Sequence, residues 1–245
     1  IDRLPRIGIY SPWSGTMNEG WLRWVLDTYG VPFVVVRNEM IRAGNLDEFL
    51  DVLLLPSLSG DQLDNGRSPG SVADEYTLGL DPEGAVAIEE FVRGGGNLVA
   101  MQSSASWAIE LFGLPMEDVT RGKDAGEFSC PGSVIRSVPT PEVGGALASG
   151  LPASIPLFFS RAAAWKIDED ADNADTIDIL LRYAPTRVLL SGWIQDPETI
   201  ANQAAWVRAN YGKGQVQLFG FRPQYRSWSM ATFPLLFRAL LLRDK

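Results

Sequence analysis

The sequence contains no histidine and a single cysteine, Cys130, among its 245 residues. Without histidine, no Ser-His-Asp triad, Cys-His pair, histidine-ligated zinc site or imidazole general base can be assembled from this chain alone. One cysteine allows no internal disulfide. Cys130 also has no basic neighbour in its segment Phe128–Gly132, which favours an inert buried thiol over a nucleophile.

Positive charge is scarce as well. Lysine and arginine number 21 against 30 aspartates and glutamates, which gives a net charge of -9. Phosphate recognition needs a basic face, so we expect no nucleic-acid partner. No apolar run reaches the roughly 18 residues of a membrane span. The acidic run Asp168–Asp172 lacks the glycine and distal glutamate of a calcium loop, and we expect no metal or other cofactor.

The first half of the sequence alternates short apolar strands with helices. Strands are predicted over 6–10, 31–36, 51–56 and 97–101, and a helix over 81–93 with Asp81 as its N-cap. Short connections between such elements indicate parallel strands in a doubly wound α/β sandwich. The second half predicts β-rich additions: strands or extended excursions over 127–138 and 157–167, strands over 177–183 and 188–193, and a hairpin over 204–220. A last helix is expected over 232–242.

Polar residues follow the strand predicted over 97–101. Ser103 and Ser104 come where a strained strand-to-helix turn would expose a nucleophile, next to Gln102. A serine hydroxyl needs a neighbouring base, and no spacing here identifies one, so a helix cap and turn is the favoured interpretation. The segment 57–80 is too long for an ordinary connection and is either a functional loop, a cover or mobile.

Two further groups of residues are candidate ligand contacts. Asn18 and Glu19 precede the first long helix, where they either bind a ligand or cap the helix. Arg222, Gln224 and Arg226 follow the strand that ends at Phe219, and arginine forks bind carboxylates and phosphates well. The alternative for Arg222 is a structural ion pair with Glu19 or another carboxylate. With Gln102 and Ser103, these residues predict a ligand crevice at the carboxyl ends of the strands.

Three stretches, 12–26, 94–101 and 211–226, together resemble a known family. The glycine-rich run Gly94–Met101 resembles the elbow region of class I glutamine amidotransferase-like domains. The other two stretches are similar to the amidotransferase-like domain found C-terminal to the peptidase unit of some bacterial zinc carboxypeptidases, in the carboxypeptidase A superfamily. The resemblance implies a flavodoxin-like sandwich, with residues 1–245 as a single domain excised from a longer, secreted or periplasmic chain.

The sequence departs from this family at the catalytic positions. Amidotransferase relatives use a cysteine at the elbow and a later histidine, and the peptidase zinc site needs a His-x-x-Glu motif with a further histidine; this chain has neither. We therefore expect a non-catalytic accessory domain whose partner is the peptidase domain of the same parent chain. The alternatives are a module that binds a small molecule, peptide or carbohydrate in the crevice, and an unconventional serine hydrolase.

Overall fold

The computed structural model describes residues 3–242. Internal contacts divide the chain into two compact units. The first comprises the described residues up to Gly113 together with Asn210–Gln217, and the second comprises Leu114–Ala209 together with the described residues from Leu218 onward. Strands β11 (Ala204–Tyr211) and β12 (Gly214–Phe219) each contribute residues to both units. The division therefore follows no linker, and the single-domain assignment stays a prediction.

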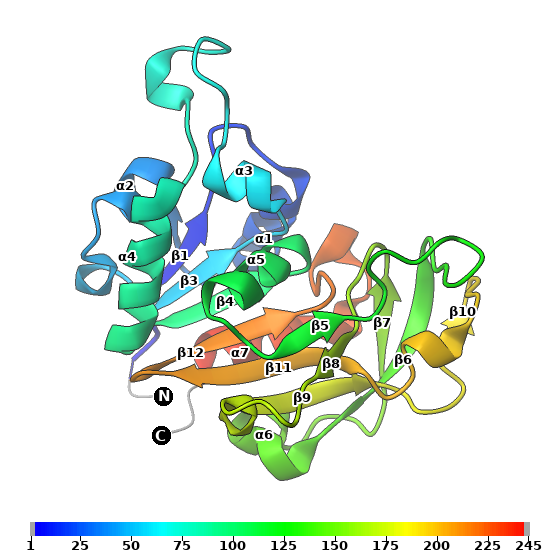
Figure 1. Cartoon of the computed structure of the whole chain (residues 1–245). Helices are drawn as coiled ribbons and strands as arrows, with labels where there is room; N and C mark the ends of the chain where they lie inside the picture. Colours follow the sequence, from blue (N-terminus) through cyan, green and yellow to red (C-terminus); the bar gives the residue numbers. More distant parts are fainter. Residues whose placement is uncertain (1–2, 243–245) are drawn as a thin grey trace. The chain divides into compact units, whose positions relative to one another are not determined.

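A parallel sheet forms the centre of the first unit (Figure 1). Its order is β2-β1-β3-β4, with β12 next to β4. The four parallel strands are β1 (Ile7–Tyr10), β2 (Val34–Val36), β3 (Val52–Leu55) and β4 (Asn97–Met101). Every residue of β1, β3 and β4 is buried, which explains why all of them except Asn97 at the start of β4 are apolar or glycine. The predicted strands are confirmed, and their order is that of flavodoxin-like sheets.

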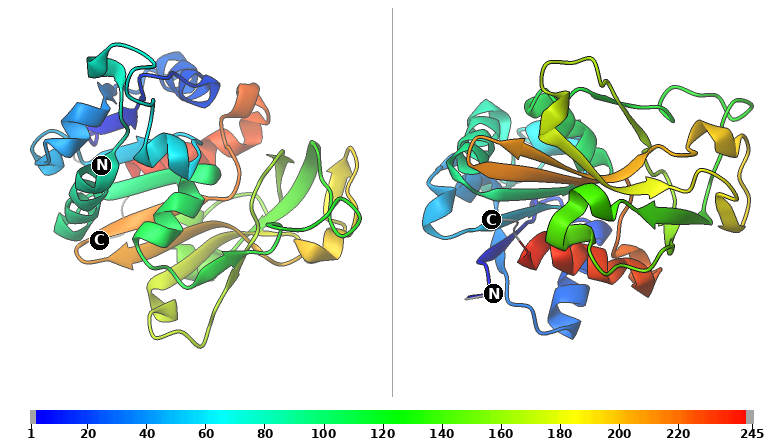
Figure 2. Two further views of the ribbon diagram at one scale, coloured as in Figure 1. Left: turned by 45° about the horizontal axis from the view of Figure 1, so that its top comes forward. Right: turned by 90° about the horizontal axis from the view of Figure 1, so that it is seen from below.

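Helices cover both faces of this sheet. Helix α1 (Met17–Thr28) lies on one face, whereas α4 (Asp81–Gly94) and α5 (Ser103–Leu111) lie on the other (Figure 2). The short helix α2 (Asn38–Arg42) packs against α4. The predicted N-cap Asp81 is wrong: it is the first residue of α4, after Leu80. Its carboxylate instead pairs with Arg42 at 2.6 Å, which ties the two helices together.

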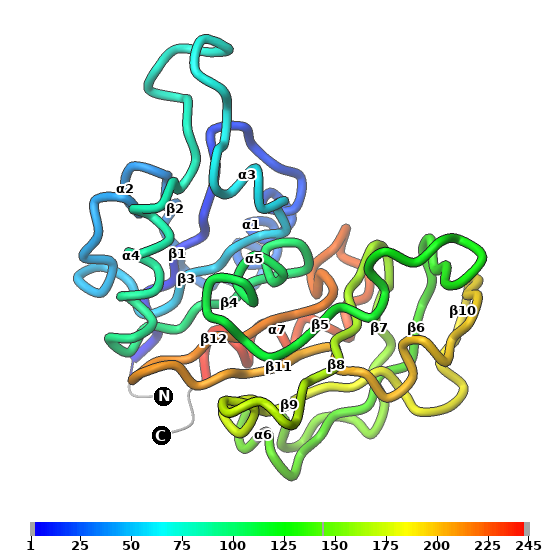
Figure 3. The backbone as a smooth tube through the Cα atoms, viewed as in Figure 1, coloured from blue at the N-terminus to red at the C-terminus, as the bar shows by residue number. Residues whose placement is uncertain are grey.

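The segment 57–80 has structure of its own (Figure 3). It opens with α3 (Gly60–Asp64), which is capped by Ser59 in a reciprocal capping box with Gln62. Gly66 follows at φ +61°, and a short bridge joins Arg67 to Leu78. This segment is thus a folded excursion with its own turn and its own helix.

The second unit is β-rich and its strand pairs are antiparallel. In it, β6 (Ser133–Pro139) pairs with β7 (Ile155–Phe159), β9 (Ile177–Tyr183) and β10 (Leu189–Ser191). Strand β9 also pairs with β11. A smaller ladder joins β5 (Met116–Asp118) to β8 (Trp165–Ile167). The helices are α6 (Pro141–Ala148) and α7 (Phe233–Leu241). Among the described residues, no helix is long and apolar enough to cross a membrane.

Candidate functional site

The turn after β4 has the geometry of a nucleophile elbow, and its strained residue is Gln102. Strand β4 ends at Met101, and α5 begins at Ser103. Gln102 between them has φ 50° and ψ −114°, a conformation that is costly for any residue with a side chain. Such a strained strand-to-helix turn is where hydrolases place a nucleophile. Here the position carries a carboxamide, which is not a nucleophile, and Gln102 is 6% exposed.

The two serines after Gln102 have different surroundings. Ser103 is exposed at the start of α5. Ser104 is fully buried; its hydroxyl donates to the Pro56 carbonyl oxygen at 2.5 Å and accepts from the Leu58 backbone N–H at 3.0 Å. Ser104 therefore fastens the elbow to the chain that leaves β3. Its hydroxyl is already used on both sides, so its geometry is that of a structural serine.

Asn18 is connected to the elbow through Ser57. The Asn18 Nδ2 donates to the Ser57 carbonyl oxygen at 2.9 Å, and the Ser57 hydroxyl donates to Gln102 Oε1 at 2.8 Å. These residues lie just beyond the carboxyl ends of β3 and β4, where open α/β sheets bind ligands. Asn18 does not cap α1, because the N-cap is Thr16, whose hydroxyl accepts from the Asn18 backbone N–H.

Glu19 is buried in the first turn of α1 and forms an ion pair with Arg23 one turn later. The negative charge is well placed near the helix N-terminus. Arg23 Nη2 also donates to the Ser11 hydroxyl at 3.3 Å, and Arg37 Nη1 lies 3.0 Å from the same oxygen. Glu19 thus belongs to a charged cluster with Arg23 and Arg37 at the end of β1.

Ser11, Ser57 and Arg37 were not among the sequence candidates. The sequence does contain a signal for them, because each lies at the end of an apolar strand. Ser11 directly follows β1, Arg37 directly follows β2, and Ser57 comes two residues after the end of β3. The carboxyl ends of parallel strands meet at one edge of a sheet, so polar residues at those positions gather there. The Arg37 guanidinium also lies 4.2 Å from the centre of the Trp13 ring.

The arginine candidates belong to the second unit, where they surround Tyr225. The Arg222 guanidinium stacks over the Tyr225 ring at 3.8 Å, and Arg222 Nη2 donates to the Ser160 carbonyl oxygen at 3.1 Å. Arg226 lies 5.3 Å from the same ring centre. Burial lowers the pKa of Arg222. Gln224 beside them is fully buried.

The predicted crevice therefore draws on residues from both units. Asn18 and Gln102 are brought together through Ser57 in the first unit, while Arg222 and Arg226 gather on Tyr225 in the second. A crevice that combines them stays a prediction.

Other chemistry is sparse in the described part of the chain. Cys130 is 7% exposed, and burial raises the pKa of its thiol, as expected for an inert cysteine. Within residues 3–242, no group of three histidine, cysteine, aspartate or glutamate side chains is arranged to hold a metal ion.

Neither a protein-family model nor a curated protein matches the chain. Solved structures do. A ThuA-like protein from Bacteroides uniformis matches with a TM-score of 0.54 at 11% identity, over 97% of this chain and 91% of its own. A GMP synthase-like protein from Thermoplasma acidophilum gives a TM-score of 0.54 at 13% identity, over 96% of this chain and 92% of its own.

The same fold occurs inside a larger enzyme. A β-galactosidase from Bacillus circulans matches 96% of this chain with 30% of its own length, at a TM-score of 0.53 and 14% identity. At these identities the likeness shows the fold alone, which is glutamine amidotransferase-like. None of these three structures is a zinc carboxypeptidase.

Proposed function

We propose that this chain is a non-catalytic accessory domain of a larger enzyme. The proposal rests on the residue found at the strained turn between β4 and α5, which is Gln102. Gln102 stands at the strained position with its amide oxygen held by Ser57, and Ser104 is committed to two backbone groups. The chain has no histidine to act as a base. A fold built to expose a nucleophile thus carries neither the nucleophile nor its activator.

The same fold as a segment of a longer chain supports an accessory role. This chain corresponds to 30% of the β-galactosidase that it resembles in fold. The finer proposal, a zinc carboxypeptidase-like parent that is secreted, rests on the sequence stretches 12–26 and 211–226. In that parent, the partner would be the peptidase domain of the same chain.

Two experiments test the proposal. In the first, the chain is incubated with a fluorophosphonate and digested for mass spectrometry, with a known serine hydrolase as the positive control. We expect no adduct on Ser103 or Ser104 after the control is fully labelled. Stoichiometric labelling of either serine would favour the serine-hydrolase alternative instead.

In the second experiment, the parent protein is produced with and without residues 1–245. We expect the deletion to change its melting temperature, its solubility or its kcat/KM, because an accessory domain acts through the protein to which it is attached. A parent that is unchanged in all three respects would contradict the accessory role.

The alternative of a binding module has one specific observation in its favour. A line of hydrogen-bonded polar groups lies at the carboxyl edge of the sheet, where this class of fold binds ligands. It consists of the half-buried Asn18 and the buried Ser57 and Gln102. Thermal shifts with carboxylates, peptides and sugars test it, since a ligand that binds only the folded state raises the melting temperature. Two variants locate such a site: Asn18→Leu, and Asn65→Leu as an exposed control in the same unit. A thermal shift that is lost in the first variant and kept in the second would favour this module.

A further inference from the structure

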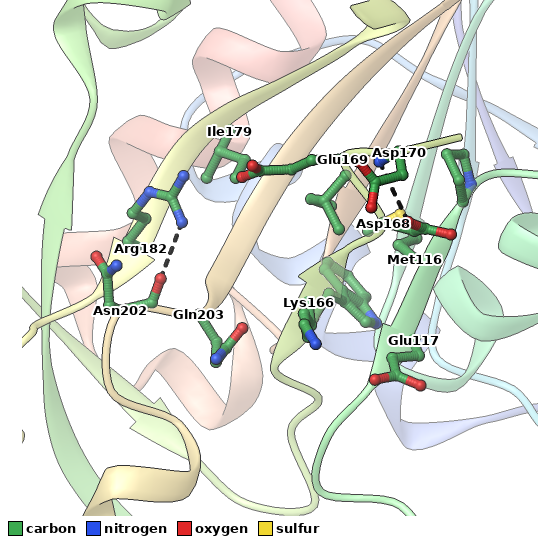
Figure 4. Close-up of a pocket in the computed structure, with 13 residues that line it drawn as sticks. Met116, Glu117, Lys166, Asp168, Glu169, Asp170, Ile179, Arg182, Asn202 and Gln203 are labelled. Atoms are coloured by element: carbon green, nitrogen blue, oxygen red, sulfur yellow. Dashed lines mark hydrogen bonds between the residues drawn. The ribbon is translucent and has the colours of Figure 1, made fainter. Parts of the chain in front are cut away.

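A pocket of about 720 Å³ lies entirely within the second unit and shares no residue with the elbow or with the arginines around Tyr225. Its wall comes from the β5–β8 ladder, the turn 168–170, strand β9 and the residues that lead into β11 (Figure 4). This volume is typical of pockets that hold a small organic molecule. Apolar side chains, among them Met116, Ile167 and Ile179, line it together with charged ones.

Charges of both signs face this pocket. Arg182 stands at one side of it and the aspartates Asp168 and Asp170 at the other, with Lys166 between them (Figure 4). Glu117 and Glu169 add two more carboxylates. A purely anionic ligand would meet four carboxylates, and a purely cationic one would meet Lys166 and Arg182. A ligand that carries both charges can match both sides.

The charged side chains of the pocket are not used up in ion pairs with one another. Among the described residues, none of the ion pairs within 4.0 Å involves a charged group of the pocket. Lys166 and Glu117 are opposite each other in the β5–β8 ladder and still form no such pair. Arg182 donates one hydrogen bond, from Nη1 to the Asn202 carbonyl oxygen at 2.9 Å, which leaves most of its five N–H groups available.

One tryptophan of the pocket wall is suited to detect binding. Trp165 is 1% exposed and contributes to the pocket wall, and its indole N–H has no hydrogen-bond partner among the described residues. Because this nitrogen is itself buried, Trp165 serves as a reporter of the pocket and not as a ligand contact.

We propose that this pocket binds a zwitterionic small molecule of the amino-acid or short-peptide class. The ligand carboxylate binds the Arg182 fork and Lys166, because a guanidinium matches a carboxylate in two parallel hydrogen bonds. The ligand ammonium lies toward Asp168 and Asp170. This proposal does not depend on the accessory-domain role, because the pocket shares no residue with the elbow.

The experiment is an isothermal titration of the full chain with three matched probes. L-alanyl-L-alanine carries both charges, its N-acetyl form lacks the cation, and its C-terminal amide lacks the anion. We expect the dipeptide to bind with a Kd of about 1 mM or tighter, and each blocked form at least about tenfold more weakly. Equal binding of a blocked form, or no binding of the dipeptide at about 10 mM, would overturn the proposal.

Variants locate the site. Lys166→Gln and Arg182→Gln are expected to weaken dipeptide binding at least about tenfold, whereas Lys123→Gln, an exposed lysine of the same unit outside the pocket, leaves it unchanged. The indole N–H resonance of Trp165, assigned with Trp165→Phe, is expected to shift on titration. Unaltered binding in both pocket variants would overturn the assignment. If a variant fails to fold, the three probes on the natural sequence still decide.

Discussion

Replacing Ser104 by alanine measures how firmly the elbow is held. The substitution removes a fully buried hydroxyl that donates to the Pro56 oxygen and accepts from the Leu58 N–H, with a longer contact of 3.4 Å to the Leu58 oxygen. Both backbone groups then lose this partner inside the protein. Each such buried group costs about 1–3 kcal/mol, so Ser104→Ala should lower the free energy of unfolding by about 3 kcal/mol. For a chain of this size, that corresponds to roughly 6–12 °C in melting temperature.

The matched control is Ser103→Ala, the same chemical change one residue earlier on the same helix. Ser103 is exposed, so its replacement should alter stability by less than about 0.5 kcal/mol. Urea unfolding followed by circular dichroism measures both variants. The dependence of the unfolding free energy on urea concentration should stay unchanged, because the same surface is exposed on unfolding.

Two results would refute the reasoning. A loss below about 1 kcal/mol in Ser104→Ala would mean that the two backbone groups find other partners. An equal loss in Ser103→Ala would mean that the start of α5, and not the buried hydroxyl, controls stability.

Three other perturbations follow from the structure. Burial opposes the charge on Asp51, but hydrogen bonds from Arg6 and Arg3 hold the pKa of Asp51 well below its ordinary value. The stabilisation by the Asp51 carboxylate is therefore complete at pH values above its unfolded pKa of about 3.9, and it declines as the pH falls toward its folded pKa. Asp51→Asn should lower the free energy of unfolding by about 2 kcal/mol at neutral pH. Unfolding measured at decreasing pH should show this difference between the two proteins disappear. Native Cys130 should react with Ellman's reagent at least roughly 100-fold more slowly than in guanidinium, and equal rates would contradict its burial. Gly66→Ala should lower the free energy of unfolding by more than about 2 kcal/mol and increase proteolysis within 57–80. The reason is that an added Cβ would lie 2.1 Å from the Leu78 oxygen, at a residue with φ +61°. Gly70→Ala, with φ +78° and open space around it, is the control for backbone strain alone.

The parallel strands were predictable because strands that are buried on both faces consist almost entirely of apolar residues. Strands β1, β3 and β4 are buried at every residue, and the sequence alone gives their positions to within a residue or two. Strand β5 has no such signal. It consists of Met116, Glu117 and Asp118, and its pairing with β8 decides that it is a strand at all. A tertiary partner of this kind leaves no local trace in the sequence.

The candidate site was predictable in location but not in detail. Polar residues after apolar strands pointed to the elbow, and the strain proved to fall on Gln102. Which residue of a turn has positive φ depends on where the strand ends and where the helix begins, and such boundaries are the least certain part of a sequence prediction. The pocket in the second unit was out of reach, because Arg182 and Asp168 come together only through antiparallel pairings between distant segments.

The shared strands β11 and β12 also govern the order in which this protein can be made. The first unit includes Asn210–Gln217, so it cannot be completed during synthesis until the ribosome has passed residue 217, about a hundred residues after Gly113. Until then β4 lacks its neighbour β12 and is an open sheet edge, the kind of surface through which nascent chains aggregate. Expression of residues 1–113 alone would fix the chain in that state, so fragments for biophysical study need the last hairpin as well.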